Sequence, residues 1–185
     1  MKHTFVQPLA TRRKQSGFTL IELLVVVTLS IMLMLAASSL FFMFLIGNAK
    51  SNAVQRVKNE GEYALDQMAF LLRNALELET NSLGQKCQED MSEITFTSFD
   101  GGITTLSSET DSDGFDKIAS NSGQYLTSGG VELLSGPEFD CVESSDGASQ
   151  YVTITFILRK GTPGIDEPRD IVQETFSTGV NMRSF

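Results

Sequence analysis

The sequence predicts an α+β protein in which a long amino-terminal helix packs on a small antiparallel β-sheet. Three features lead to this prediction: an unbroken apolar run, an amphipathic helical pattern after it, and a change to alternating periodicity near residue 90. The apolar stripe of such a helix needs a covering layer, which a sheet provides. We divide the chain into a basic leader (1–17), a transmembrane helix (18–46), an amphipathic helix (47–82) and a β-rich globular domain (83–185).

The leader places a cluster of cations, Arg12 to Lys14, just before the apolar run. Loops rich in Lys and Arg stay in the cytoplasm, so the part of the chain after the run is expected outside. Residues 18–46 are long enough to span, because about 20 apolar residues cross a ~30 Å hydrocarbon core. Glu22 is the only charged residue in this run.

A carboxylate inside lipid marks a functional site by default. Insertion scales put its cost at roughly 2.5–3.5 kcal/mol near a helix centre and less near an end. The partner that we predict for Glu22 is a cationic α-amine, released when the chain is cut between Gly17 and Phe18. The cations at 12–14, Gly17 before the cut, Phe18 as first mature residue and Glu22 as the fifth occur here in a fixed order.

This arrangement resembles the class III prepilin signal of type IV pilins and type II secretion pseudopilins. The resemblance implies methylation of the Phe18 amine, and assembly through Phe18 and Glu22, with Glu22 pairing with the amine of its own chain or of a neighbouring subunit. It also implies three kinds of partner: other pilin or pseudopilin subunits through the amino-terminal helix, the prepilin peptidase, and an inner-membrane assembly platform. The implied location is the inner membrane, then a pilus or a periplasmic pseudopilus.

Two other interpretations of the apolar run stay open. An ordinary signal peptide has an apolar region of about 7–15 residues before a small-residue cut, and Ala36 to Ser39 offers small residues. That cut would leave an apolar mature terminus, since Leu40 to Ile46 follow. An uncleaved signal anchor would leave Glu22 unexplained.

After a loosening at Gly47 and Asn48, apolar residues recur at three- and four-residue steps between Val54 and Leu76. This stripe predicts an amphipathic helix that packs against its own domain and ends near residues 80–82, with Gly84 beyond.

The β-rich domain shows strand patterns of unequal clarity. Residues 151–158 form the clearest strand, being rich in β-branched and aromatic side chains. Residues 94–99 alternate, 131–134 are a weaker candidate, and 171–176 with 180–183 suggest a final strand or a bulged pair. Residues 100–130, rich in Gly, Ser, Thr and Asp, are expected to form loops with at most short strands.

Composition narrows the function. Lys and Arg total 14 and Asp and Glu total 23, and removal of the leader leaves 10 cations against the same 23 acids. So acidic a product is not expected to bind nucleic-acid phosphates directly. The single histidine, His3, lies in the leader, so the mature chain would lack imidazole for acid–base catalysis or metal ligation. We therefore expect no enzyme.

Cys87 and Cys141 both follow the membrane segment. An oxidising exterior would allow them to form a disulfide, whereas a cytoplasmic protein would keep two free thiols. The crosslink would close a loop across 54 positions and contribute roughly 4 kcal/mol in the chain-entropy account.

An acidic segment over residues 109–116 raises the question of a calcium site, because calcium prefers flexible oxygen-rich loops. Some pseudopilins hold calcium in such a loop. Asp111, Asp113 and Asp116 are the candidate ligands here, but the twelfth position counted from Asp111 is Ser122 rather than Glu. We favour a solvated acidic turn, and hence expect no metal or cofactor, with calcium as the alternative.

Within the resemblance, two departures from major pilins favour a minor pilin or pseudopilin. No proline occurs between Pro8 and Pro137, and the cysteines do not close a carboxy-terminal loop. The late strand ending at Phe185 resembles the group of J-type pseudopilins and W-type minor pilins. One alternative is a membrane-anchored adhesin that does not polymerise; another is an anchored hydrolase using carboxylates such as Asp111 and Asp113.

Overall fold

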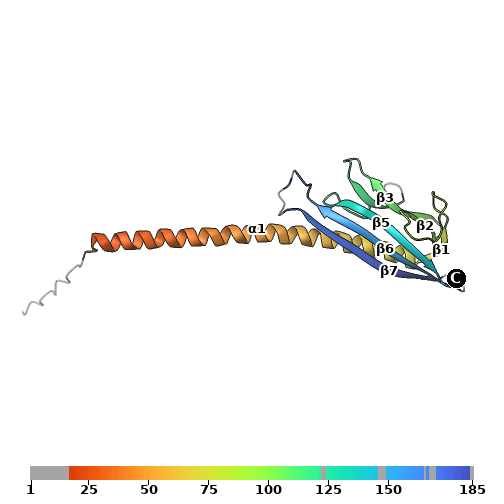
Figure 1. Cartoon of the computed structure of the whole chain (residues 1–185), viewed down its shortest axis with the longest axis horizontal. Coiled ribbons are helices and arrows are strands. Elements are labelled where there is room, and N and C mark those ends of the chain that lie inside the picture. Colours follow the sequence, from red (N-terminus) through yellow and green to blue (C-terminus); the bar gives the residue numbers. More distant parts are fainter. Residues whose placement is uncertain (1–16, 122–123, 146–148, 165, 167–169, 184–185) are drawn as a thin grey trace, which may run out of the picture. The chain divides into compact units, whose positions relative to one another are not determined.

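A computed structural model describes residues 17–121, 124–145, 149–164, 166 and 170–183 (Figure 1). The chain divides into two compact units, Met1–Leu45 and Ile46–Phe185. Each unit is described by itself. The helix α1 (Leu20–Arg73) contributes residues to both. The predicted α+β fold is confirmed: one long helix and two antiparallel sheets make up the regular structure of the described residues.

Helix α1 runs without a break through Gly47 and Asn48 and ends at Arg73. The predicted end near residues 80–82 is wrong, because Ala75–Glu79 forms the strand β1. Just after the helix, Asn74 donates from its side-chain Nδ2 to the Phe70 carbonyl at 2.7 Å. A β-bulge between Ala75 and Glu77 spaces the buried residues Ala75 and Leu78 three positions apart. That spacing imitates a helical stripe, which explains the error.

The strands form two sheets rather than the single sheet expected. Four strands pair in the order β1-β2-β3-β4, where β2 is Ile94–Ser98, β3 is Ile103–Thr110 and β4 is Asp116–Ser120. Three longer strands pair in the order β5-β6-β7, namely Glu132–Glu143, Ser149–Lys160 and Val172–Arg183. All neighbours are antiparallel.

Three strands differ from expectation for identifiable reasons. Strand β3 has Leu106 as its single buried residue, so its sequence lacks an alternating apolar pattern. Strand β5 extends well past 131–134, but its register shifts twice between Leu133 and Glu138 and blurs the period. Strand β7 is one strand, paired with β6 without a register shift.

The core of the Ile46–Phe185 unit lies between the second part of α1 and the sheets. Small and medium side chains of α1 are buried there: Ala53, Val57, Gly61, Ala64, Met68, Ala69 and Leu72. Phe96, Phe139 and Phe156 supply the largest buried rings. Gly61 is needed for close approach, since a Cβ at this position would lie 2.2 Å from the Phe176 ring. The predicted packing of the amphipathic stripe is therefore correct over these residues.

The loop between β4 and β5 is fixed to the helix and to a buried cation. The Glu60 carboxylate accepts hydrogen bonds from the Ser128 backbone N–H at 3.0 Å and from its hydroxyl at 2.7 Å. The Lys117 ammonium donates to the Ser128 carbonyl at 2.8 Å and to the Val131 carbonyl. Lys117 is only 2% exposed, so these carbonyls satisfy a charge that solvent cannot reach.

Candidate functional site

The start of α1 is built by a helix cap next to the predicted cut. Thr19 precedes the first helical residue, and its side-chain Oγ1 accepts a hydrogen bond from the Glu22 backbone N–H at 3.3 Å. Its carbonyl accepts from the N–H groups of Glu22 and Leu23 at 3.1 and 3.2 Å. Gly17 and Phe18 lie outside the helix and are exposed. The bond that we predict to be cut thus lies in exposed, non-helical backbone.

The cap explains why Glu22 is tolerated at this position. Thr19 and Glu22 have the spacing of a capping box, in which a Thr at the cap is followed three residues later by Glu. An acid in the first helical turn also interacts favourably with the positive end of the helix dipole. The sequence-based prediction did not include this cap, although the spacing of the two residues encodes it. Glu22 is exposed, which is compatible with the pairing predicted for its carboxylate.

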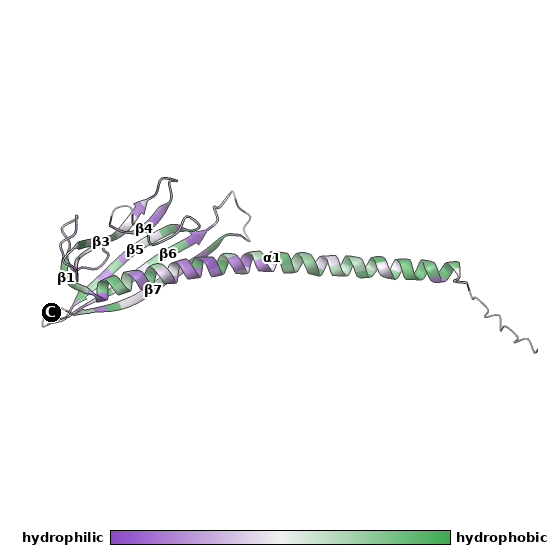
Figure 2. Ribbon diagram, turned by 180° about the vertical axis from the view of Figure 1, so that it is seen from behind, coloured by the Kyte–Doolittle hydropathy of each residue, from purple (hydrophilic) through white to green (hydrophobic). Residues whose placement is uncertain are grey.

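The first part of α1 presents a continuous apolar surface. Every described residue from 17 to 52 is exposed, including the large side chains between Leu20 and Ile46. Figure 2 shows this stretch as predominantly hydrophobic. The hydroxyls of its polar residues donate to carbonyls one turn back: Thr28 to Val25, Ser30 to Val26, Ser38 to Met34 and Ser39 to Ala36. Their polarity is satisfied within the helix, as a lipid environment demands.

By length and composition this helix could cross a membrane, and none of its most apolar window is buried. The arginines and lysine of the leader, which are predicted to stay on the cytoplasmic side, lie outside the described residues. Cleavage after Gly17, methylation of Phe18 and pairing by Glu22 stay predictions.

Comparison with known protein families gives a match at the amino-terminal part of the chain. Residues 12–38 match the model of the prokaryotic N-terminal methylation motif. The curated proteins and the solved structures contain no significant match to this chain. The chain carries the class III prepilin signal shared by type IV pilins and pseudopilins. The match supports a pilin-like precursor.

This class has general consequences. The motif points to a family of structural subunits rather than enzymes. It implies interaction with other pilin subunits and with the prepilin peptidase. Together with the apolar helix, it supports anchoring in a membrane before assembly.

In the Ile46–Phe185 unit, a disulfide joins Cys87 to Cys141 with a Cα–Cα distance of 5.0 Å. It ties the loop after β1 to strand β5. Backbone hydrogen bonds extend the attachment, because Met91 and Phe139 exchange N–H and carbonyl contacts at 3.1 and 2.8 Å. Cys141 donates to the Gln88 carbonyl at 2.8 Å. Residues 87–91 therefore cover part of the outer edge of β5.

The calcium candidates form a self-contained turn. Asp111 accepts hydrogen bonds from the backbone N–H groups of Asp113 and Phe115 at 2.9 and 3.0 Å. Its other oxygen lies 4.0 Å from the Lys117 ammonium. Asp116 accepts from the Thr110 hydroxyl at 2.7 Å. Two of the three carboxylates are thus engaged by protein donors.

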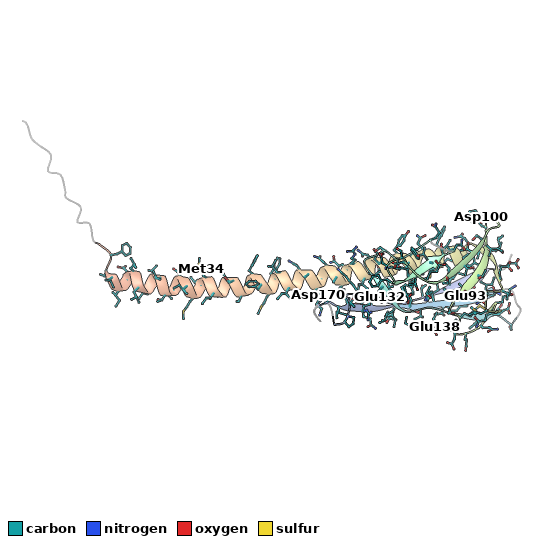
Figure 3. All side chains as sticks on the ribbon, turned by 90° about the horizontal axis from the view of Figure 1, so that it is seen from above. Met34, Glu93, Asp100, Glu132, Glu138 and Asp170 are labelled. Carbon is teal, nitrogen blue, oxygen red and sulfur yellow. A yellow bond between two sulfur atoms is a disulfide. The ribbon has the colours of Figure 1, made fainter. Side chains whose placement is uncertain are left out.

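Among the described residues, three carboxylates converge elsewhere: oxygens of Asp90, Glu138 and Asp140 lie within 4.8 Å of one another. Asp140 also accepts from the Asp90 backbone N–H at 2.9 Å. A side-chain hydrogen bond with Asp90, aided by desolvation and by the charge of Asp140, raises the pKa of Glu138 above its ordinary value. Figure 3 labels Glu138 at the surface of this unit.

This acidic cluster was not predicted from the sequence, because Asp90 and Asp140 are fifty positions apart. One signal could have found it. Asp90 lies three residues after Cys87 and Asp140 directly precedes Cys141, so the predicted disulfide brings the two acids into the same region of the domain.

Proposed function

We propose that this chain is a minor pilin or pseudopilin that is processed after Gly17 and enters, or primes, a type IV pilus or a type II secretion pseudopilus through its apolar helix. The observation that carries the proposal is a prepilin signal directly followed by an apolar helical surface that the described chain leaves exposed. Such a surface needs lipid or neighbouring helices, because its burial is the driving force for association.

The proposed mechanism begins with the cut. It would place a cationic α-amine at Phe18, four residues before Glu22, and methylation would keep that amine charged. In the membrane, the low dielectric would strengthen the attraction between the amine of one subunit and the Glu22 carboxylate of the next. Once paired, the apolar helices would leave the lipid together and bury their Leu, Val, Ile and Phe side chains against one another.

A minor rather than a major role is supported by the proline-free helix. Major pilins usually carry a proline within this segment, where the helix melts in the fibre, whereas α1 runs from Leu20 to Arg73 without one. The position of the disulfide, at 87 and 141, also differs from a carboxy-terminal crosslink. These features favour a minor pilin or a pseudopilin over a major pilin.

Mass spectrometry of the native amino terminus tests the processing. We expect a chain that begins at Phe18 and is one methyl group heavier than the unmodified product. A chain that keeps Met1, or that begins after Ala37, would remove the basis of the proposal.

Glu22→Ala tests assembly separately from folding. We expect the variant to insert and fold but to lose incorporation into sheared fibres, because the amine of the next subunit has no partner. Ser30→Ala is the matched control, since it changes a polar residue of the same helix whose hydroxyl bonds its own backbone. Incorporation of Glu22→Ala at the wild-type level would favour the non-polymerising adhesin.

A further inference from the structure

We propose that the outer face of strands β1–β3 is a docking surface for a basic protein segment that also carries apolar side chains. We call this surface the β1–β3 patch and define it by three exposed apolar residues, Leu76, Phe99 and Ile103, with the neighbouring acids Glu77 and Asp100. The β1–β3 patch lies wholly within the Ile46–Phe185 unit, so its binding would not depend on pilus assembly.

The apolar residues of the patch are brought together by strand register. Ile103 on β3 pairs with Thr97 on β2, and Glu77 on β1 pairs with the same Thr97. Leu76 is the extra residue of the β1 bulge and is exposed together with Glu77. Phe99 follows β2 directly, in the turn closed by the Gly101 N–H and the Ser98 carbonyl.

Among the described residues of this unit, Phe99 and Ile103 are the most exposed large apolar side chains. Phe99 is 77% exposed, Ile103 67% and Leu76 41%. A single exposed apolar residue needs no explanation, but several gathered at one edge mark an interaction site. A protruding aromatic residue is also the kind of anchor that dominates binding energy at interfaces.

The part of the chain that follows β1 is mostly acidic. From Cys87 to Leu158 the sequence contains 13 Asp and Glu residues and one cation, Lys117. Lys117 is buried, bonded to backbone carbonyls and 4.0 Å from Asp111, so it presents no cation at the surface. The nearest exposed cations in sequence, Arg73 and Lys86, lie outside β1 on either side. Figure 3 labels Asp100 at the periphery of this unit.

Charge complementarity therefore selects the partner. A second copy is disfavoured, because residues 46–185 hold 22 acids and 10 cations, and like charges would meet. A bilayer surface is disfavoured for the same reason, since anionic lipids repel acids. A basic segment would be attracted by the field of the acids and held by contact with Phe99 and Ile103.

Peptide binding to the full chain in phosphatidylcholine nanodiscs tests this proposal, with empty nanodiscs as blank. The probes are three labelled peptides of about a dozen residues: alternating Lys and Leu, the same peptide with Glu for Lys, and the same peptide with Ser for Leu. We expect only the Lys/Leu peptide to bind, with roughly a ten-fold or greater loss of affinity between about 50 and 500 mM salt, as electrostatic attraction requires.

Two double variants distinguish binding at the patch from nonspecific binding to exposed apolar side chains. Phe99→Ser with Ile103→Ser should reduce affinity by roughly ten-fold or more, the effect of losing an anchor residue. Tyr63→Ser with Phe70→Ser removes two rings of similar exposure, 56% and 60%, from α1 and should leave affinity unchanged. Thermal melts check that both variants fold.

Several results would overturn the proposal. Equal binding of the Lys/Ser peptide would mean attraction by charge alone, and equal binding of the Glu/Leu peptide would mean that charge plays no part. Unchanged affinity of the Phe99/Ile103 variant, or an equal loss in the Tyr63/Phe70 variant, would place the contact elsewhere.

Discussion

The two parts of α1 use one helix for opposite purposes. From Leu20 to Leu45 its side chains are all exposed and mostly large and apolar, whereas from Ile46 to Arg73 its buried side chains are mostly small. Small residues let a sheet approach closely, as Phe176 does over Gly61. Large exposed side chains bury no apolar surface against their own chain, but they can bury it against a partner. Residue size along the helix therefore indicates where the chain packs on itself and where it needs a partner.

The largest expected effect on stability comes from removing the disulfide of the Ile46–Phe185 unit. Replacing Cys87 and Cys141 together by Ser should lower its free energy of unfolding by roughly 2–5 kcal/mol, because the unfolded chain regains the entropy of an open loop. Denaturant titration of the full chain in detergent measures this loss, and the helical signal of residues 20–45 should persist through the transition. If the helical signal of residues 20–45 were lost in the same transition as the fold of the second unit, the two parts of α1 would not be unfolding separately.

A matched pair of leucine substitutions sharpens the comparison within the helix. Leu72→Ala empties a fully buried site and should cost about 2–5 kcal/mol of domain stability. Leu35→Ala changes a residue that is 68% exposed, so the domain should unfold as in the wild type. If both variants shifted the unfolding midpoint equally, the first part of the helix would be supporting the domain directly.

Gly61→Ala should produce a smaller change. Alanine favours the helix by roughly 1 kcal/mol, but its Cβ would overlap the Phe176 ring, and overpacking costs about 1–3 kcal/mol. We expect a modest net loss in the thermal midpoint. Gly47→Ala is the control, since nothing lies within 4 Å of a Cβ there. Equal stabilisation by both changes would show that the ring moves aside without cost.

The smallest effect is a pH dependence confined to the acidic cluster. Glu138 has a raised pKa in the folded chain, so the folded state binds its proton more tightly than the unfolded state. Stability from this group is therefore present below the ordinary pKa of 4.5 and is lost as pH rises through the raised value. Glu138→Gln should flatten that slope in thermal melts between about pH 4 and 7, whereas an unchanged slope would assign it to another group.

Local patterns in the chain were sufficient to predict the apolar helix, its single acid and the strand at 151–158, because residue period and composition encode these features. They also supplied Cys87 and Cys141, which the structure joins. They misplaced the end of the helix, since the bulge in β1 copies a helical spacing and only pairing with β2 reveals a strand.

Contacts between residues far apart in the chain depend instead on folding. The neighbouring residues in the sequence do not distinguish Asp90 and Glu138 from other acids, and only folding brings these two together. In the same way, only folding buries Lys117 against the β4–β5 loop. The β1–β3 patch arises in the same way, from strand register. Local sequence fixes which face a side chain prefers, whereas the closure of long loops fixes which side chains meet.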